Sequence, residues 1–182
     1  MTVPISVSVR PSTLRLGEWS ITEAVSAKAV HDRLGPPTRI VDPCPPPPVG
    51  HRNNMMHVYD DYGFYFNEHH YTRRMQGVVL VLCPEEQQHG FSPEKAFDGT
   101  IDLEDATIHS ETTEADLRRL NRIREWCGTW DTTCGSLSVF ITMRGHKLPS
   151  GKRSRSRRIV DVSIGWPHDP WKVPDALGSS TT

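Results

Sequence analysis

The sequence predicts an α+β fold: an antiparallel β-sheet meander with about two helices packed on one face. Three observations predict it. Short segments near both ends of the chain alternate apolar and polar residues, which is typical of half-buried strands. Aromatic and β-branched runs separated by tight turns fill the middle of the chain. Two further stretches place apolar residues three or four positions apart, as amphipathic helices do.

The first part of the chain predicts two short strands or a hairpin, followed by a helix. Apolar residues alternate with polar ones over residues 3–16, with a break at Pro11. Ser20 and Glu23 have the spacing of a capping box at a helix N-terminus. We expect that helix to end at Gly35, because glycine readily adopts the left-handed conformation that closes a helix.

The middle of the chain predicts a meander. Residues 57–66 read as two strands joined by a turn at 60–63. The apolar run 78–82 is expected to be a central strand buried on both faces. Shorter strands are expected at 101–103 and around Ile108.

The last part predicts a second helix and two more strands. Thr113 and Asp116 are placed to begin the helix, and apolar residues continue at helical spacing as far as Cys127. Clean alternation over 137–143 and over 160–164 predicts two strands.

We expect one α+β domain over residues 1–173 and a disordered tail over 174–182. Two segments interrupt the domain. Residues 42–56 form a Pro-rich loop with four consecutive prolines, which favour an extended conformation, and this loop is either a stiff surface loop or a ligand for a proline-reading domain. Residues 144–158 form a basic loop that is expected to join the last two strands as a wide, mobile connection.

Charge is distributed unevenly although the formal net charge is only -1. Residues 85–116 carry ten acidic side chains and a single Lys or Arg, Lys95. Residues 144–158 carry seven Lys or Arg and no acid. Either segment can steer a partner of opposite charge.

The N-terminal residues lack the basic and apolar regions of a signal peptide, and the longest apolar run, 78–83, is too short to span a bilayer. We therefore expect a cytoplasmic protein without a membrane partner. In that compartment the four cysteines, Cys44, Cys83, Cys127 and Cys134, are expected to be reduced thiols.

No catalytic motif is recognisable: the sequence has neither a phosphate-binding glycine loop nor a G-x-S-x-G elbow. The cysteines and nine histidines lack the paired spacing of a zinc site. We expect no enzymatic activity, no small-molecule substrate, no metal and no cofactor. A metal-dependent hydrolase built on His69, His89, His109 and the cysteines remains an alternative.

Four sequence motifs occur in a recognisable order: Leu34-Gly35-Pro36-Pro37, the run 59–64 (YDDYGF), the run 75–82 (MQGVVLVL) and the run 97–103 (FDGTIDL). This order of motifs resembles that of small, uncharacterised bacterial proteins with the pattern LGxP…YDDxGI…IxxIxI…FxGxLxI. Several of these look like immunity partners of polymorphic or secreted antibacterial toxins. The helix-then-meander part also resembles the repeated module of β-lactamase-inhibitor-like proteins. The resemblance covers residues 14–108, and its matched scaffold positions are Gly35, Tyr59, Asp61, Gly63, Phe97 and Gly99.

The resemblance implies an immunity protein that binds a cognate toxin in the producing cell and occludes the toxin's active site. Aromatic anchors and acidic side chains suit such an interface. The residues expected to contact the toxin are Asp60, Asp61, Tyr62, Tyr65, Glu68, Tyr71, Asp98, Asp102, Glu104 and Asp105.

The alternative function is that of a nucleic-acid-binding accessory protein, with the basic segment releasing counterions from phosphates. The residues expected to make that contact are Lys152, Arg153, Arg155, Arg157 and Arg158. Nucleic acid is the less expected partner, because the segment has no interleaved aromatics for base stacking.

Overall fold

The computed structural model describes residues 5–43, 54–70, 72–87, 90–104, 106–120, 123–126, 129–147, 150 and 152–166. The side chains of 126, 146, 147 and 153–156 also lie outside the described part. The elements, in chain order, are β1 (Val7–Arg10), β2 (Thr13–Leu16), β3 (Trp19–Ile21), β4 (Val25–Ser26), α1 (Ala27–Leu34), β5 (Arg39–Val41), β6 (Met55–Tyr59), β7 (Phe64–Glu68), β8 (Arg74–Val81), the 3-10 helix η1 (Pro84–Glu86), β9 (Ile101–Asp102), β10 (Thr107–Ile108), α2 (Glu114–Arg118), β11 (Arg124–Trp126), β12 (Thr129–Cys134), β13 (Leu137–Lys147) and β14 (Arg153–Gly165).

The larger of two sheets has nine strands. Eight of them follow the order β11-β12-β13-β14-β8-β7-β6-β5, and β4 pairs with the beginning of β8. All of these neighbours are antiparallel. The predicted central strand is confirmed, because β8 lies between β14 and β7 and buries Val78, Leu80 and Val81.

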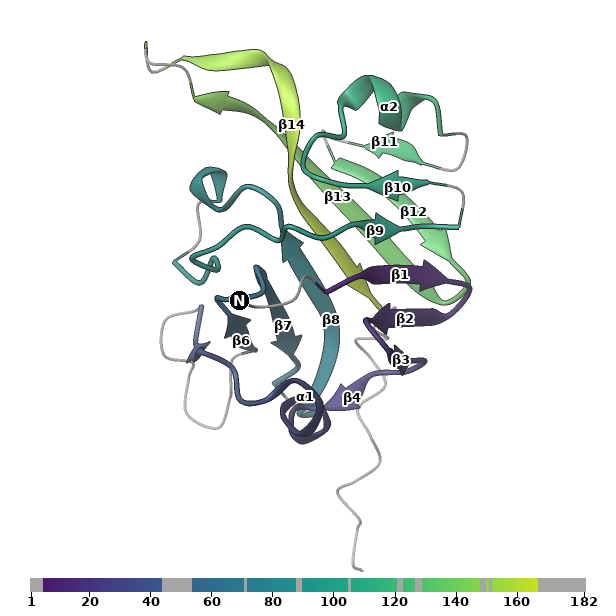
Figure 1. Cartoon of the computed structure of the whole chain (residues 1–182), viewed down its shortest axis with the longest axis vertical. Coiled ribbons are helices and arrows are strands. Elements are labelled where there is room, and N and C mark those ends of the chain that lie inside the picture. The colour runs from purple at the N-terminus through teal and green to yellow at the C-terminus, as the bar shows by residue number, and fades with distance from the viewer. Residues whose placement is uncertain are drawn as a thin grey trace, which may run out of the picture.

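The smaller sheet has five strands in the order β10-β9-β1-β2-β3. The predicted N-terminal hairpin is confirmed as β1 and β2, which pair from Val7↔Leu16 to Arg10↔Thr13. The parallel pairing of β1 with β9 joins two segments that lie far apart in the sequence. Figure 1 shows this sheet lying in front of strands β12, β13 and β14.

The two sheets enclose one hydrophobic core. Its buried side chains come mainly from β1 and β2 of the smaller sheet and from one face of β7, β8, β13 and β14, which we call the inner face of the large sheet. Representative members are Val9, Leu14, Leu80, Val139 and Val162. Burial of this apolar surface is the main force that holds the layers together.

The predicted α+β class is therefore wrong, because a second sheet, and not a pair of helices, packs against the large sheet. Among the described residues the fold is mostly β and resembles a β-sandwich. Helix α1 has eight residues and buries Val30, and α2 has five residues and buries Leu117. Helices this short contribute one or two core side chains each, so they fill the margins of the core.

The two predicted helices are each partly correct. The first begins at Ser26, whose side chain accepts the N–H of Ala29, and not at Ser20. Ser20 lies in β3, where the backbone pairs with β2. The predicted end of the first helix is confirmed, because Gly35 has φ 83° and its N–H donates to the carbonyl of His31.

The start of the second helix is also confirmed, since Thr113 and Asp116 form a capping box. That helix ends at Arg118 and does not reach Cys127.

The predicted loop over residues 144–158 is wrong for most of its length. Strands β13 and β14 run through it and pair with one another out to Lys147↔Arg153. Figure 1 shows this pair extending beyond the rest of the sheet. Most of the Pro-rich segment and all of the 174–182 tail lie outside the described residues.

Candidate functional site

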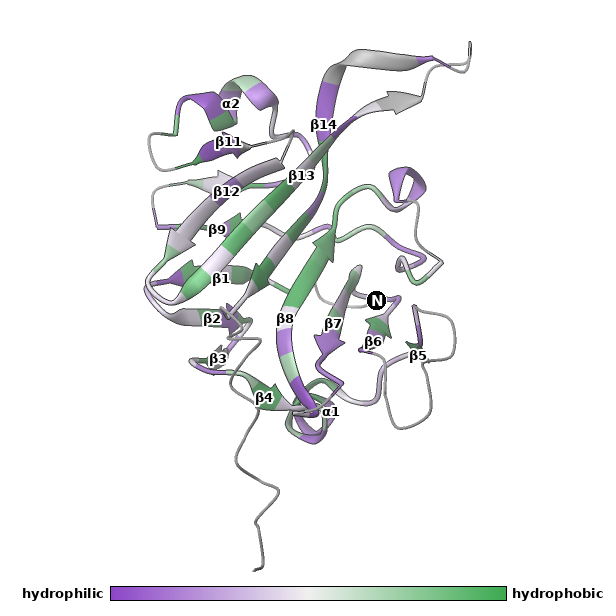
Figure 2. Cartoon of the chain, turned by 180° about the vertical axis from the view of Figure 1, so that it is seen from behind, coloured by the Kyte–Doolittle hydropathy of each residue, from purple (hydrophilic) through white to green (hydrophobic). Residues whose placement is uncertain are grey.

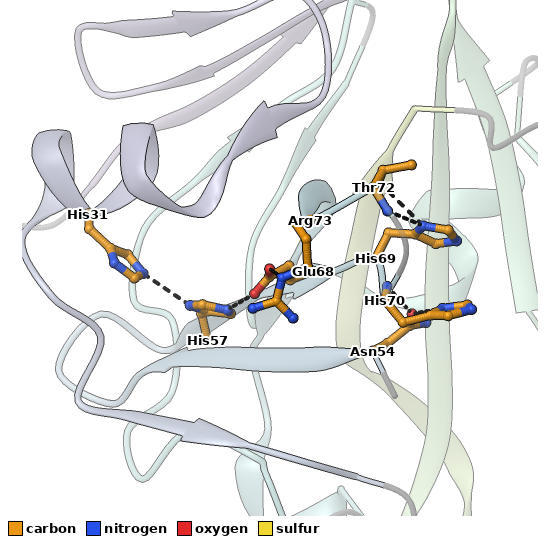
Figure 3. A network of polar contacts seen from close by, with 8 residues as sticks. All are labelled: His31, Asn54, His57, Glu68, His69, His70, Thr72 and Arg73. Carbon is orange, nitrogen blue, oxygen red and sulfur yellow. Dashed lines mark hydrogen bonds and ion pairs between the residues drawn. The ribbon is translucent and has the colours of Figure 1, made fainter. Parts of the chain in front are cut away.

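A chain of polar side chains connects helix α1 to the inner face of the large sheet. Nε2 of His31 on α1 lies 3.0 Å from Nδ1 of His57 on β6. Nε2 of His57 lies 2.6 Å from Oε2 of Glu68 on β7. The other carboxylate oxygen of Glu68 lies 2.7 Å from Nε of Arg73, which sits in the turn before β8. Figure 3 shows the four side chains in sequence. We call them the histidine relay.

The direction of the hydrogen bonds follows from the chemistry of the two ends. A carboxylate accepts only, so Nε2–H of His57 donates to Glu68. In a neutral imidazole Nδ1 is then an acceptor, and Nε2–H of His31 donates to it. Burial lowers the pKa of His57 below its ordinary value, against the opposing attraction of the Glu68 carboxylate, which favours this neutral form.

The relay cannot present His57 or Glu68 to a substrate. His57 is 3% exposed and Glu68 is 2% exposed. Arg73 is the solvent-facing end, with 51% of its side chain exposed, and it balances the charge of Glu68. The arrangement therefore fixes α1 and the β6–β7 pair in one geometry.

Two other histidines near this turn organise the local backbone. The ring nitrogen Nδ1 of His69 lies 3.3 Å from both the backbone N and the hydroxyl of Thr72. The N–H of His70 donates to the side-chain oxygen of Asn54, 3.0 Å away. Among the described residues, no group of three or more His, Cys, Asp or Glu is placed to hold a metal ion.

A second buried ion pair fixes the other end of the β6–β7 hairpin. Nε and Nη2 of Arg39 lie 3.1 Å from the two carboxylate oxygens of Asp60. The backbone N–H of Glu94 also donates to Asp60, at 2.9 Å. Burial by itself would raise the pKa of Asp60, but these hydrogen bonds outweigh it and lower that pKa below its ordinary value.

The opposite face of the large sheet, which we call the outer face, is only partly covered. Over β6, β7 and β8 it carries a small apolar cluster of Val58, Tyr65 and Val81, against which Phe91 packs. Tyr65 and Phe91 meet edge to face with ring centroids 5.3 Å apart. Figure 2 looks onto this face, with β12, β13, β14 and β8 towards the viewer.

Beside that cluster the outer face contains a groove of about 390 Å³, which we call the outer groove. Its floor is hollow because Gly77 on β8 pairs directly with Gly165 on β14, so neither strand supplies a side chain there. The lining residues are Asn67, Gln76, Gly77, Val78, Val79, Ser138, Phe140, Ser163, Ile164, Gly165 and Trp166.

The glycine at the floor is required by close backbone contact. A Cβ at Gly77 would lie 2.5 Å from the carbonyl oxygen of Ile164, well inside van der Waals contact. The side-chain oxygen of Asn67 in the groove wall is buried and has no hydrogen-bond partner among the described residues.

An exposed aromatic ring stands at the edge of the outer groove. Phe140 on β13 is 47% exposed, and it lies opposite Asp131 on β12 and Ser163 on β14. Asp131 is half-buried and has no ion-pair partner among the described residues. None of the described residues that line the groove is Lys or Arg. An exposed aromatic ring beside a groove with an acidic neighbour has the chemistry of a protein-binding surface.

The residues that the sequence suggested for toxin binding do not form one surface in the structure. Asp60 and Glu68 are buried in ion pairs, and Tyr65 is 8% exposed inside the outer-face cluster. Tyr62 is half-buried and stacks on Phe64. Of these five predictions, the structure leaves only Asp61 exposed, and it pairs with Lys95.

The remaining predicted acids lie near or in the smaller sheet. Asp98 and Glu104 are exposed, and Asp102 is half-buried, with its carboxylate accepting from the hydroxyl of Thr107. Tyr71 and Asp105 lie outside the described residues. Of the residues predicted for nucleic-acid contact, Lys152, Arg157 and Arg158 are exposed, and the side chains of Arg153 and Arg155 lie outside the described part.

Sequence reasoning missed both the histidine relay and the outer groove. One sequence feature could have indicated the relay: His57 lies on the same face as Tyr59 in an apolar strand, so its imidazole is expected to be buried. The groove had a weaker one, the glycine at position 77 inside an otherwise apolar strand pattern.

The fold and these sites define a two-sheet β protein with one partly open sheet face. The chain belongs to the family described as a domain of unknown function (DUF7738), whose model matches residues 6–118. This match covers the relay and one side of the outer groove, whereas β13 and β14 lie beyond it. No curated protein and no solved structure matches the chain. Among the described residues, no helix is both long and apolar enough to cross a membrane.

Proposed function

We propose that this chain is an immunity protein that binds a cognate antibacterial toxin in the cytoplasm of the producing cell and occludes the toxin's active site. The resemblance of residues 14–108 to immunity-like proteins supports the function. The observation that carries the proposal is the outer groove with Phe140 exposed at its edge.

The outer face offers what an inhibitor needs. Rigid strands form the floor of the groove, so little conformational entropy is lost when a partner binds. Phe140 supplies an apolar anchor, and aromatic residues are frequent among the few that dominate binding energy. Serines at 138 and 163 supply hydrogen-bonding groups around it.

The charge around the groove selects the kind of toxin segment that fits. Asp131 faces the same side as Phe140 and lacks an ion-pair partner among the described residues. A loop that carries an apolar side chain next to Lys or Arg therefore complements this face, and the acidic side chain increases its rate of association.

This proposal replaces the surface that the sequence suggested. The buried residues Asp60, Tyr65 and Glu68 act as scaffold, because they fix the hairpin and the cluster that underlie the outer face. The acids at 98, 102 and 104 lie near or in the smaller sheet and do not line the groove.

The test is co-expression of this chain with the reading frame adjacent to it in its native locus. We expect the neighbour alone to arrest growth, this chain to restore it, and the two products to co-purify as a one-to-one complex. Rescue without a complex would contradict inhibition by occlusion. A harmless neighbour that does not bind would contradict the immunity function.

A further inference from the structure

We infer that His31 and His57, which we call the histidine pair, form a pH-sensitive switch that releases helix α1 from the large sheet in acid. This inference goes beyond the proposed function, because it concerns a movement of the fold and neither histidine lines the outer groove. It rests on the geometry of the pair, on the charged groups around it and on the way α1 is attached to the sheet.

The two imidazoles of the histidine pair share one hydrogen bond. Nε2 of His31 lies 3.0 Å from Nδ1 of His57, and the ring centroids are 5.1 Å apart. Figure 3 shows the two rings pointing toward each other. A hydrogen bond needs one donor and one acceptor, so only one of the two facing nitrogens can carry a proton.

The pair tolerates one additional proton but not two. If His57 gains a proton at Nδ1, the contact persists only when Nε2 of His31 becomes the acceptor, so His31 must then be neutral. If both rings are charged, two N–H donors face each other and two like charges repel. Histidines commonly take up protons as the pH falls below about 6.5. Acid therefore drives the pair towards a state in which its hydrogen bond cannot form.

The surroundings decide which of the two rings moves. Burial lowers the pKa of His57, the Glu68 carboxylate raises it, and the charges of His31 and Arg73 lower it further. Once charged, His57 is retained by Glu68, whose carboxylate lies 2.6 Å away. His31 is only half-buried, and water solvates its charged ring when that ring turns outward. His31 is therefore the ring that leaves.

Helix α1 has little else to hold it once His31 leaves. Val30 is the fully buried side chain of its eight residues, and two others are partly buried against the core. Just beyond the helix, the hydroxyl of Tyr59 donates to the carbonyl of Gly35 at 3.1 Å. Segments with few buried apolar contacts open locally at a lower free energy than the whole fold. Loss of the His31 contact therefore releases α1 before the two sheets separate.

The experiment measures amide hydrogen exchange of the full chain at pH 7.5 and pH 5.5, with rates corrected for the intrinsic effect of pH on exchange. Protection of the α1 amides is compared with that of β8 and β13, which report global unfolding. We expect α1 protection to fall at least about tenfold more than that of the two strands, because facing donors cost more than a lost hydrogen bond.

The variant H31Q separates titration from the structural role of the side chain. A glutamine amide carries a donor and an acceptor and does not titrate, so it can contact Nδ1 of His57 in either protonation state. We expect the ratio of α1 protection between the two pH values to match that of β8 and β13 in H31Q, and also in H57Q. This ratio is insensitive to any constant loss of stability in the variants. The control H109Q makes the same substitution at an exposed histidine and should lose α1 protection as the wild type does.

Three results would overturn the inference. One is α1 protection that does not change between the two pH values. Another is a loss in α1 no larger than that in β8 and β13, which would show only global destabilisation. The third is a wild-type loss of α1 protection in both H31Q and H57Q, which would assign the effect to a different titrating group.

Discussion

His57 and Glu68 lie against each other in the core, on adjacent strands, with Nε2 of the imidazole 2.6 Å from Oε2 of the carboxylate. Neither side chain is more than 3% exposed. Through His31 and Arg73 the same pair reaches helix α1 on one side and solvent on the other. A buried pair linked in this way makes the stability of the fold depend on pH.

The free energy of unfolding should fall as the pH drops from 7.5 to 5. Burial lowers the pKa of His57 in the folded protein, although the Glu68 carboxylate raises it in part. At a pH between the folded and the unfolded pKa of this histidine, the unfolded chain therefore binds more protons than the folded one. Stability is therefore present above the unfolded pKa of about 6.5 and is lost as the pH falls through it. Protonation also turns Nδ1 into a donor that faces the donor of His31. Urea unfolding at a series of pH values measures this dependence.

The variant H57Q should flatten that dependence, because glutamine keeps a donor for Glu68 but does not titrate. His109, whose ring accepts from the exposed backbone N–H of Glu111, provides a control, and H109Q should leave the profile unchanged. The change in the free energy of unfolding near pH 6.5 comes from the titration of His57. The lowered pKa of Asp60 acts in a separate window, where stability falls as the pH drops below about 4. A slope between pH 5 and 7.5 that H57Q leaves intact would contradict the account.

Asp60→Asn should destabilise the fold by about 2 kcal/mol, whereas Asp61→Asn should leave stability unchanged within error. Asp60 is 6% exposed and accepts three hydrogen bonds, two from Arg39 and one from the backbone of Glu94. Asp61 is its neighbour in sequence but has 66% of its side chain exposed. Chemical denaturation of the two variants measures the difference. Equal effects would show that the Arg39 pair does not stabilise the hairpin.

Gly63→Ala should cost at least 2 kcal/mol more than Gly17→Ala. Both glycines have positive φ, 73° and 59°, so alanine strains both backbones by about 1 kcal/mol. At Gly63 a Cβ would also lie 2.2 Å from the backbone nitrogen of Phe97, whereas no atom of the described residues lies within 4 Å of one at Gly17. Thermal unfolding of the two variants compares them directly. Similar melting temperatures would mean that the 63–97 contact is looser than the structure has it.

The strands could be predicted where alternation was clean and local. Residues 137–143 and 160–164 became the paired β13 and β14, and the hairpin over 57–66 became β6 and β7. The class was wrong because the second sheet depends on pairing between β1 and β9, which lie far apart in the sequence. The helix start was misplaced because the spacing of Ser20 with Glu23 is compatible with a capping box. Long-range pairing of β3 with β2 decided that segment, and local spacing does not report it.

The sites were harder to predict than the strands, because they depend on neighbours across strands. The relay joins residues 11 positions apart on adjacent strands to a helix 26 residues earlier. The outer groove depends on the register that sets Gly77 against Gly165, almost ninety residues away. Several of the acidic residues and tyrosines predicted to contact a toxin instead stabilise the fold, as Asp60 does through its ion pair with Arg39.

The central claim is that a toxin binds at the outer groove, and Phe140 tests it most directly against Ile40. These are the two large hydrophobic residues that the structure exposes among its described residues, 47% and 51%, and Ile40 lies on the edge strand β5, away from the groove. The measurement is calorimetric titration of the co-purifying neighbour protein with wild type, F140A and I40A. The account predicts that F140A weakens binding at least about thirtyfold, equivalent to about 2 kcal/mol, while I40A binds as the wild type does. Full affinity in F140A, or an equal loss in I40A, would contradict it.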